Sequence, residues 1–146
     1  MAKLIVFLDA GHGLYTAGKR TPDGSLREFQ FNDPTAEYVN DLLKNYANVE
    51  TYFVYDEDGS TDTPLKTRTD RANAIYAKNK GAKAVYVSIH ANAYGSGWNS
   101  ADGIETYVYT TKPAEAVQLA NKVQSALIKA TGRDNRGVKS ANFHVL

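Results

Sequence analysis

Residues 4–13 read LIVFLDAGHG, and this stretch decides how the rest of the chain is interpreted. Its first five residues form an unbroken apolar run, which is typical of a central strand covered on both faces. The run ends at Asp9, and the chain then passes through His12, which has a glycine on either side. We therefore predict a buried first strand that ends in a sharp, glycine-dependent turn.

Beyond this strand the sequence alternates between helix and strand patterns. Helix starts are indicated by prolines at Asp33-Pro34, where Asp33 is the expected N-cap, and at Thr63-Pro64 and Lys112-Pro113. Further strands are expected over residues 49–55, 84–90 and 104–109. This order predicts an α/β fold with a mainly parallel central sheet flanked by helices on both faces.

The composition excludes several kinds of protein. The chain has no cysteine, so disulfides and thiolate metal sites are ruled out, and a metal would need His, Asp or Glu ligands. Its net charge of +1 provides no field for nucleic acid or anionic lipid. No apolar stretch approaches the ~20 residues of a membrane span. Because Asp9 ends the first apolar run too soon for a secretory signal, we expect synthesis in the cytoplasm without a signal peptide.

Two histidines carry the chemistry of the sequence. His12 follows the first predicted strand and His90 ends the third, so both are expected at the edge where an open α/β sheet binds ligands. Two histidines and one carboxylate are enough for a catalytic zinc site, which keeps one position open for water or substrate. Either histidine taken alone is equally well explained as a satisfied polar group at a strand end. The residues alone do not separate Asp9, Glu28 and Glu105 as the third ligand.

The sequence resembles the type 3 class of zinc-dependent N-acetylmuramoyl-L-alanine amidases, which includes bacterial autolysins and phage endolysins. The resemblance runs from Leu4 to Leu146, and the segments that carry it are Asp9-Ala10-Gly11-His12-Gly13, Glu28 with Asn32, Arg71-Ala72-Asn73, Ser88-Ile89-His90-Ala91-Asn92 and Gly103-Ile104-Glu105-Thr106-Tyr107. It implies that His12, Glu28 and His90 bind Zn²⁺. It also implies cleavage of the amide between N-acetylmuramic acid and the first L-alanine of the peptidoglycan stem peptide.

The resemblance also indicates what residues 1–146 lack. Family members place a general-base glutamate on a strand that follows a segment like residues 137–146, and they then close with a helix. We therefore expect an amidase catalytic domain that lacks this strand and helix, with Glu105 as the nearest substitute for the base. The tail from Gly132 is expected to turn through residues 134–137. We expect a monomer, with self-association if the truncation exposes an apolar face.

Three residues are predicted to contact substrate: Asn92, Arg136 and His144. The arginine offers a planar fork that suits muropeptide carboxylates. Each has a plainer explanation, as a turn residue or a surface side chain. The expected partner is peptidoglycan, with action on the cell wall. Two alternatives stay open: a non-catalytic remnant that binds zinc and peptidoglycan, and another zinc hydrolase, either a peptidase or a deacetylase.

Overall fold

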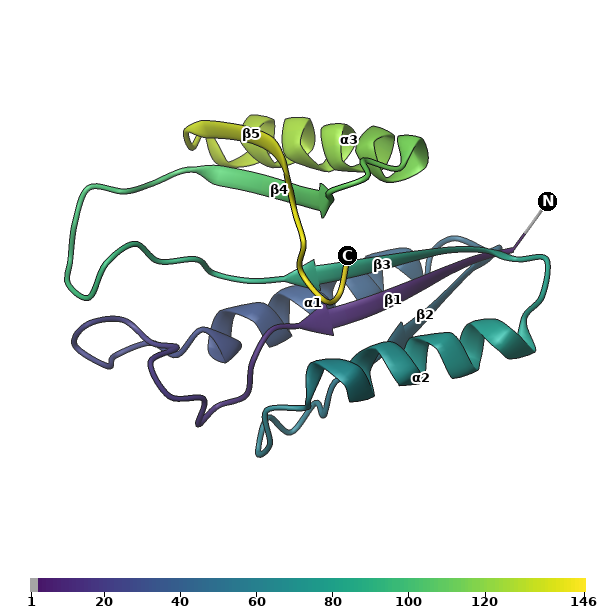
Figure 1. The fold of residues 1–146 in the computed structure, drawn as a ribbon, viewed down its shortest axis with the longest axis horizontal. Coiled ribbons are helices and arrows are strands. Elements are labelled where there is room, and N and C mark those ends of the chain that lie inside the picture. The colour runs from purple at the N-terminus through teal and green to yellow at the C-terminus, as the bar shows by residue number, and fades with distance from the viewer. Residues whose placement is uncertain (1–2) are drawn as a thin grey trace. The chain divides into compact units, whose positions relative to one another are not determined.

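The computed structural model describes residues 3–146, which form two compact units (Figure 1). The first unit ends at Gly97, and its elements are β1 (Leu4–Ala10), α1 (Phe29–Leu43), β2 (Val49–Phe53), α2 (Leu65–Lys78) and β3 (Lys83–Ile89). The second unit spans Trp98–His144 and contains β4 (Ile104–Tyr109), α3 (Ala114–Thr131) and β5 (Asn135–Ala141). Among the described residues, none of the helices has the length and apolar character needed to cross a bilayer.

β1 is the centre of the first unit. The sheet has the order β2-β1-β3, and both pairings are parallel, with Leu4 opposite Val49 on one side and Lys83 on the other. Alternate residues of β1 enter two separate cores. Val6, Leu8 and Ala10 pack with Phe29 and Ala36 of α1, whereas Ile5 and Phe7 pack with Ala72 of α2. Helices therefore cover both faces of this sheet, which explains the unbroken apolar run and confirms the predicted α/β class.

The second unit contains a strand that the sequence analysis missed. β5 pairs in parallel with β4, where residues 134–137 were expected to form only a turn. Its sequence, NRGVKSA, has one large apolar residue, so its strand conformation depends on hydrogen bonds to β4 rather than on a hydrophobic pattern. The buried Gln124 of α3 adds bonds to Ile104 O and to Asn135 Oδ1, both at 2.7 Å. Within residues 3–146 the strands are thus hydrogen-bonded as two parallel sheets, β2-β1-β3 and β4-β5.

The first helix begins earlier than its proline predicts. α1 starts at Phe29, with Glu28 as its N-cap residue and Pro34 inside the helix. A proline at this depth removes one backbone donor from the helix. Two buried anchors outweigh that loss: Phe29 packs in the core, and Asn32 Nδ2 donates to Gly11 O at 3.0 Å. This early start ties the beginning of α1 to the turn after β1. Helices α2 and α3 begin directly after Pro64 and Pro113, as expected.

Candidate metal centre

The strand order creates the place where the site forms. From β1 the chain passes to β2 on one side and then returns to pair β3 on the other side of β1. The carboxyl ends of β1 and β3 therefore flank the point where the strand order reverses, which is where α/β sheets bind ligands. His12 lies two residues past β1, and His90 directly follows β3. Glu28 reaches the same point from the start of α1.

Three side chains of the first unit converge there. His90 Nδ1 lies 2.9 Å from Glu28 Oε1, and His12 Nε2 lies 3.4 Å from Glu28 Oε2. The two imidazole rings are perpendicular, with their centroids 4.9 Å apart. One ligand atom from each residue lies within 4.8 Å of the others, and among residues 3–146 only this group has the composition and spacing of a metal site. The geometry is that of two imidazole nitrogens and one carboxylate around a common centre.

Both glycines beside His12 are required by close packing. A Cβ on Gly11 would lie 2.1 Å from His90 Cε1, so the absence of a side chain makes room for the second imidazole. A Cβ on Gly13 would lie 2.9 Å from backbone atoms of Thr61 and Asp62. His12 itself has φ of +67°, a left-handed conformation that costs an L-residue about 1–2 kcal/mol. The turn therefore holds a strained histidine between two glycines.

Burial and charge set the protonation of the group. Burial lowers the pKa of His12 and outweighs the negative charge of Glu28, which acts to raise it, so the neutral imidazole that binds metals is favoured. Burial acts to raise the pKa of Glu28, but hydrogen bonding to His90 and the charge of His12 outweigh it and lower that pKa. The carboxyl of Glu28 is thus ionised near neutral pH. A carboxylate beside a neutral imidazole is the state in which both can donate electron pairs to a cation.

Backbone and amide groups orient Glu28. Its Oε1 accepts a hydrogen bond from Ala91 N at 3.2 Å and lies 3.5 Å from Asn32 Nδ2. Asn32 is fully buried and is also bonded to Gly11 O. The carboxylate is consequently tied both to the turn after β1 and to the segment after β3. Such contacts fix the direction in which a ligand carboxylate points.

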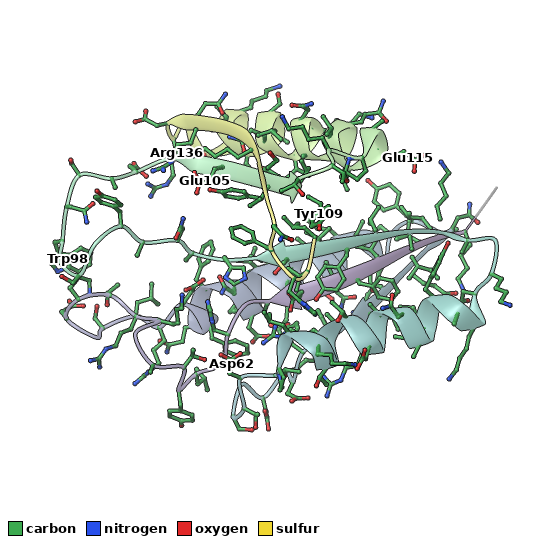
Figure 2. All side chains as sticks on the ribbon, viewed as in Figure 1. Asp62, Trp98, Glu105, Tyr109, Glu115 and Arg136 are labelled. Carbon is green, nitrogen blue, oxygen red and sulfur yellow. The ribbon has the colours of Figure 1, made fainter. Side chains whose placement is uncertain are left out.

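The other two candidates for third ligand are engaged elsewhere. Asp9 is buried and pairs with Arg68 and with Ser88 Oγ, 2.7 Å away. Glu105 belongs to the second unit, where its Oε2 lies 2.5 Å from Lys139 Nζ and 3.0 Å from Arg136 Nε (Figure 2). Lys139 holds the pKa of Glu105 at about 2. A carboxylate with this pKa is a weak proton acceptor at neutral pH, so its surroundings weigh against the predicted general-base role.

The three predicted substrate contacts occupy different places. Asn92 lies two residues beyond His90 in the first unit, and its Oδ1 accepts from Ala93 N at 2.9 Å. Arg136 lies in β5 and pairs with Glu105. His144 follows β5 and is exposed. The contacts of Asn92 and Arg136 given above are local to their own segments, and the three assignments stay predictions.

Two residues near His12 escaped the sequence analysis. Arg68 of α2 is 1% exposed, and Asp62 lies in the loop before that helix (Figure 2). Arg68 could have been found, because it occupies the same helix face as Leu65, Ala72 and Ile75. A charged residue on an apolar stripe indicates a buried ion pair. The resemblance had directed attention to Arg71 instead, which pairs with Asp56 at 2.9 Å.

A family model for N-acetylmuramoyl-L-alanine amidases matches residues 6–146. The chain belongs to this family. It is 32% identical over 142 residues to the N-acetylmuramoyl-L-alanine amidase LytC of Bacillus subtilis, and 32% identical over 148 residues to the uncharacterized protein YqiI of the same organism. The crystal structure of an N-acetylmuramoyl-L-alanine amidase from Clostridium difficile 630 superposes with a TM-score of 0.81 at 32% identity. It matches all of this chain, which in turn covers 74% of that structure.

The matched relatives are longer than this chain. The alignments include 97% of the chain but only 62% of YqiI and 26% of LytC. The shared region is therefore one part of those proteins. Family membership and fold extend to residues 6–146, whereas the activity of a whole relative is not transferred with them.

Proposed function

We propose that this chain is a zinc-dependent peptidoglycan amidase domain that cleaves the bond between N-acetylmuramic acid and L-alanine. The proposal rests on its family and on one observation: ligand atoms of His12, Glu28 and His90 lie within 4.8 Å of one another. With no cysteine in the chain, this set of nitrogen and oxygen donors suits zinc and leaves a coordination position open. When bound, zinc supplies Lewis acidity to the scissile carbonyl and to the attacking water.

The residues of the chain prepare the centre for a cation. Glu28 presents one oxygen toward each imidazole, Oε1 toward His90 Nδ1 and Oε2 toward His12 Nε2. The short contact between Glu28 and His90 requires a proton between them, and a bound cation would replace that proton. Because protons compete with the cation for these ligand atoms, zinc uptake should weaken as the pH falls.

Metal content tests the centre directly. His12→Ala and His90→Ala should each abolish stoichiometric zinc in elemental analysis of the purified protein, because a single remaining histidine and one carboxylate form an incomplete site. His144→Ala is the matched control, since this third histidine lies outside the cluster and its loss should leave the zinc content unchanged. Full zinc occupancy in either ligand variant would show that the ligands are wrongly assigned.

The products released from purified walls test the reaction. An amidase should generate new alanine amino termini without new reducing ends or free glucosamine, and a chelator should stop their release. Free glucosamine would indicate a deacetylase, and other new amino termini a peptidase.

A second function is favoured by the ion pairs of Glu105. Because Lys139 and Arg136 hold this carboxylate, Glu105 is a poor proton acceptor. If no other group of the chain takes the proton of the attacking water, the domain binds the wall without hydrolysing it. Zinc uptake and co-sedimentation with purified walls, without any release of alanine termini, would support that function over the amidase.

A further inference from the structure

Arg68 is the most heavily engaged charged side chain beside the centre. Its guanidinium donates to five acceptors: Asp9 Oδ1, Ala10 O, His12 O, Asp62 Oδ1 and Thr63 O, at 2.5, 2.6, 3.1, 3.3 and 2.7 Å. Arginine is suited to this role because its planar fork holds several donors in fixed directions. Asp9 alone would neutralise the charge. The other four acceptors therefore indicate that Arg68 also positions the groups that it contacts, in addition to pairing its charge with Asp9.

Two of these contacts fall on the backbone of the turn that carries His12. Arg68 Nη1 donates a hydrogen bond to the carbonyl oxygen of Ala10, and Nη2 donates one to the carbonyl oxygen of His12. These carbonyls flank Gly11, and His12 has the left-handed φ of +67°. A strained conformation persists only where surrounding contacts over-determine it. Arg68 supplies such contacts from α2 without reaching the ligand atoms.

Asp62 connects the same guanidinium to the imidazole. Its Oδ1 accepts from Arg68, and its Oδ2 lies 3.8 Å from His12 Nδ1. Oδ2 also accepts from Thr16 Oγ1 at 2.8 Å, and Thr16 Oγ1 accepts from Gly13 N at 2.9 Å. The carboxylate is thus held on two sides. Its negative charge favours a proton on Nδ1, which leaves Nε2, the nitrogen that faces Glu28, free to donate its electron pair.

We propose that Arg68 and Asp62 are positioning residues for His12: Arg68 fixes its backbone and Asp62 fixes the tautomer of its ring. This inference rests on the proposed function for the identity of the metal alone, because the orientation of His12 exists in the protein itself. Residues behind a metal ligand typically change metal affinity 10–100-fold when they are lost. A purely structural ion pair would change stability and leave zinc affinity unaltered.

Zinc affinity separates the two roles. We would measure the zinc dissociation constant by competition with a chromophoric chelator for the wild type, Asp62→Ala and Arg68→Lys. Both variants should bind zinc about 10–100-fold more weakly. Arg71→Lys is the matched control: it makes the same change on the same helix, where the guanidinium pairs with Asp56, and its dissociation constant should stay within about threefold of the wild type. Asp62 is 43% exposed at its side chain, so Asp62→Ala tests the proposal even if Arg68→Lys fails to fold.

A spectroscopic measurement on the metal-free protein tests the inference independently of zinc. Long-range ¹⁵N–¹H correlation spectra report which ring nitrogen is protonated, and the three histidines can be assigned with single variants. His12 should carry its proton on Nδ1 in the wild type and lose that preference in Asp62→Ala. If the wild type binds no zinc, the proposed function fails, and this spectrum still decides the positioning role. An unchanged tautomer together with unchanged zinc affinity in Asp62→Ala would overturn the inference.

Discussion

Replacing Gly11 with alanine should disable the metal centre while leaving the fold intact. The new Cβ would lie 2.1 Å from His90 Cε1 and 2.5 Å from both ring nitrogens. Ordinary contact begins near 3.4 Å, so the imidazole must retreat by more than an ångström. Gly11 does not have a left-handed φ, and the backbone therefore accepts alanine. The clash is with the His90 side chain, which can adopt another rotamer.

The required movement sets the size of the effect. Zinc–nitrogen distances of about 2.0–2.1 Å tolerate deviations of only about 0.2 Å. His90 cannot both clear the new methyl group and keep such a bond, so the centre loses one of its three ligands. Losing a group behind a ligand costs about 10–100-fold in affinity, and we expect losing a ligand to cost at least about a hundredfold, equivalent to about 2.7 kcal/mol.

Chelator competition measures this loss, and thermal unfolding of the metal-free protein followed by circular dichroism monitors the fold. Gly97→Ala is the matched control, because a Cβ there meets nothing within 4 Å and its backbone is not left-handed. Gly11→Ala should unfold at nearly the wild-type temperature yet bind zinc far more weakly. A zinc dissociation constant within threefold of the wild type would refute the reasoning that His90 is packed against Gly11 as a ligand.

Three further predictions concern stability. Arg68→Met leaves Asp9 buried without its cation and should lower the free energy of unfolding by about 3–5 kcal/mol in urea titrations; a loss below about 1 kcal/mol would contradict the ion pair. Gly13→Ala pushes a methyl group against the backbone of residues 61 and 62 and should cost about 1–3 kcal/mol in the same assay. Because Lys139 lowers the pKa of Glu105 from 4.5 to about 2, its stabilisation is complete above pH 4.5 and is lost as the pH falls toward 2. Acid titration of Glu105→Gln should therefore be flatter across that window than that of the wild type.

β1 was predictable because its burial under helices on both faces leaves a continuous apolar run, and β3 has a similar run. Leu4–Leu8 and residues 84–90 match β1 and β3 to within two residues. Their ends also located both histidines, since parallel strands finish at the same edge of a sheet. The position of Glu28 followed only from the family resemblance. Which acidic residue folds back onto that edge depends on the 18-residue connection between β1 and α1, whose path leaves no periodic signal.

Other features are determined by tertiary contacts. Asp33-Pro34 has the chemistry of a helix start, but Asn32 and Phe29 are anchored in the core and extend α1 toward Glu28. β5 has no strand pattern of its own and is defined by its hydrogen bonds to β4. Local propensity is a weak guide wherever a few buried contacts decide the conformation.

The pairing of β1 with β3 ends at Ala10 and Ile89, followed by one backbone bond from Gly11 N to Ile89 O. His12 and His90 come immediately after this last rung, and Glu28 joins them from a helix 62 residues away from His90 in sequence. An ion shared by the three would act as a removable cross-link in a chain that has no covalent one. Removing the ion with a chelator would then destabilise the carboxyl ends of β1 and β3, as reduction of a disulfide destabilises the segments that the disulfide joins.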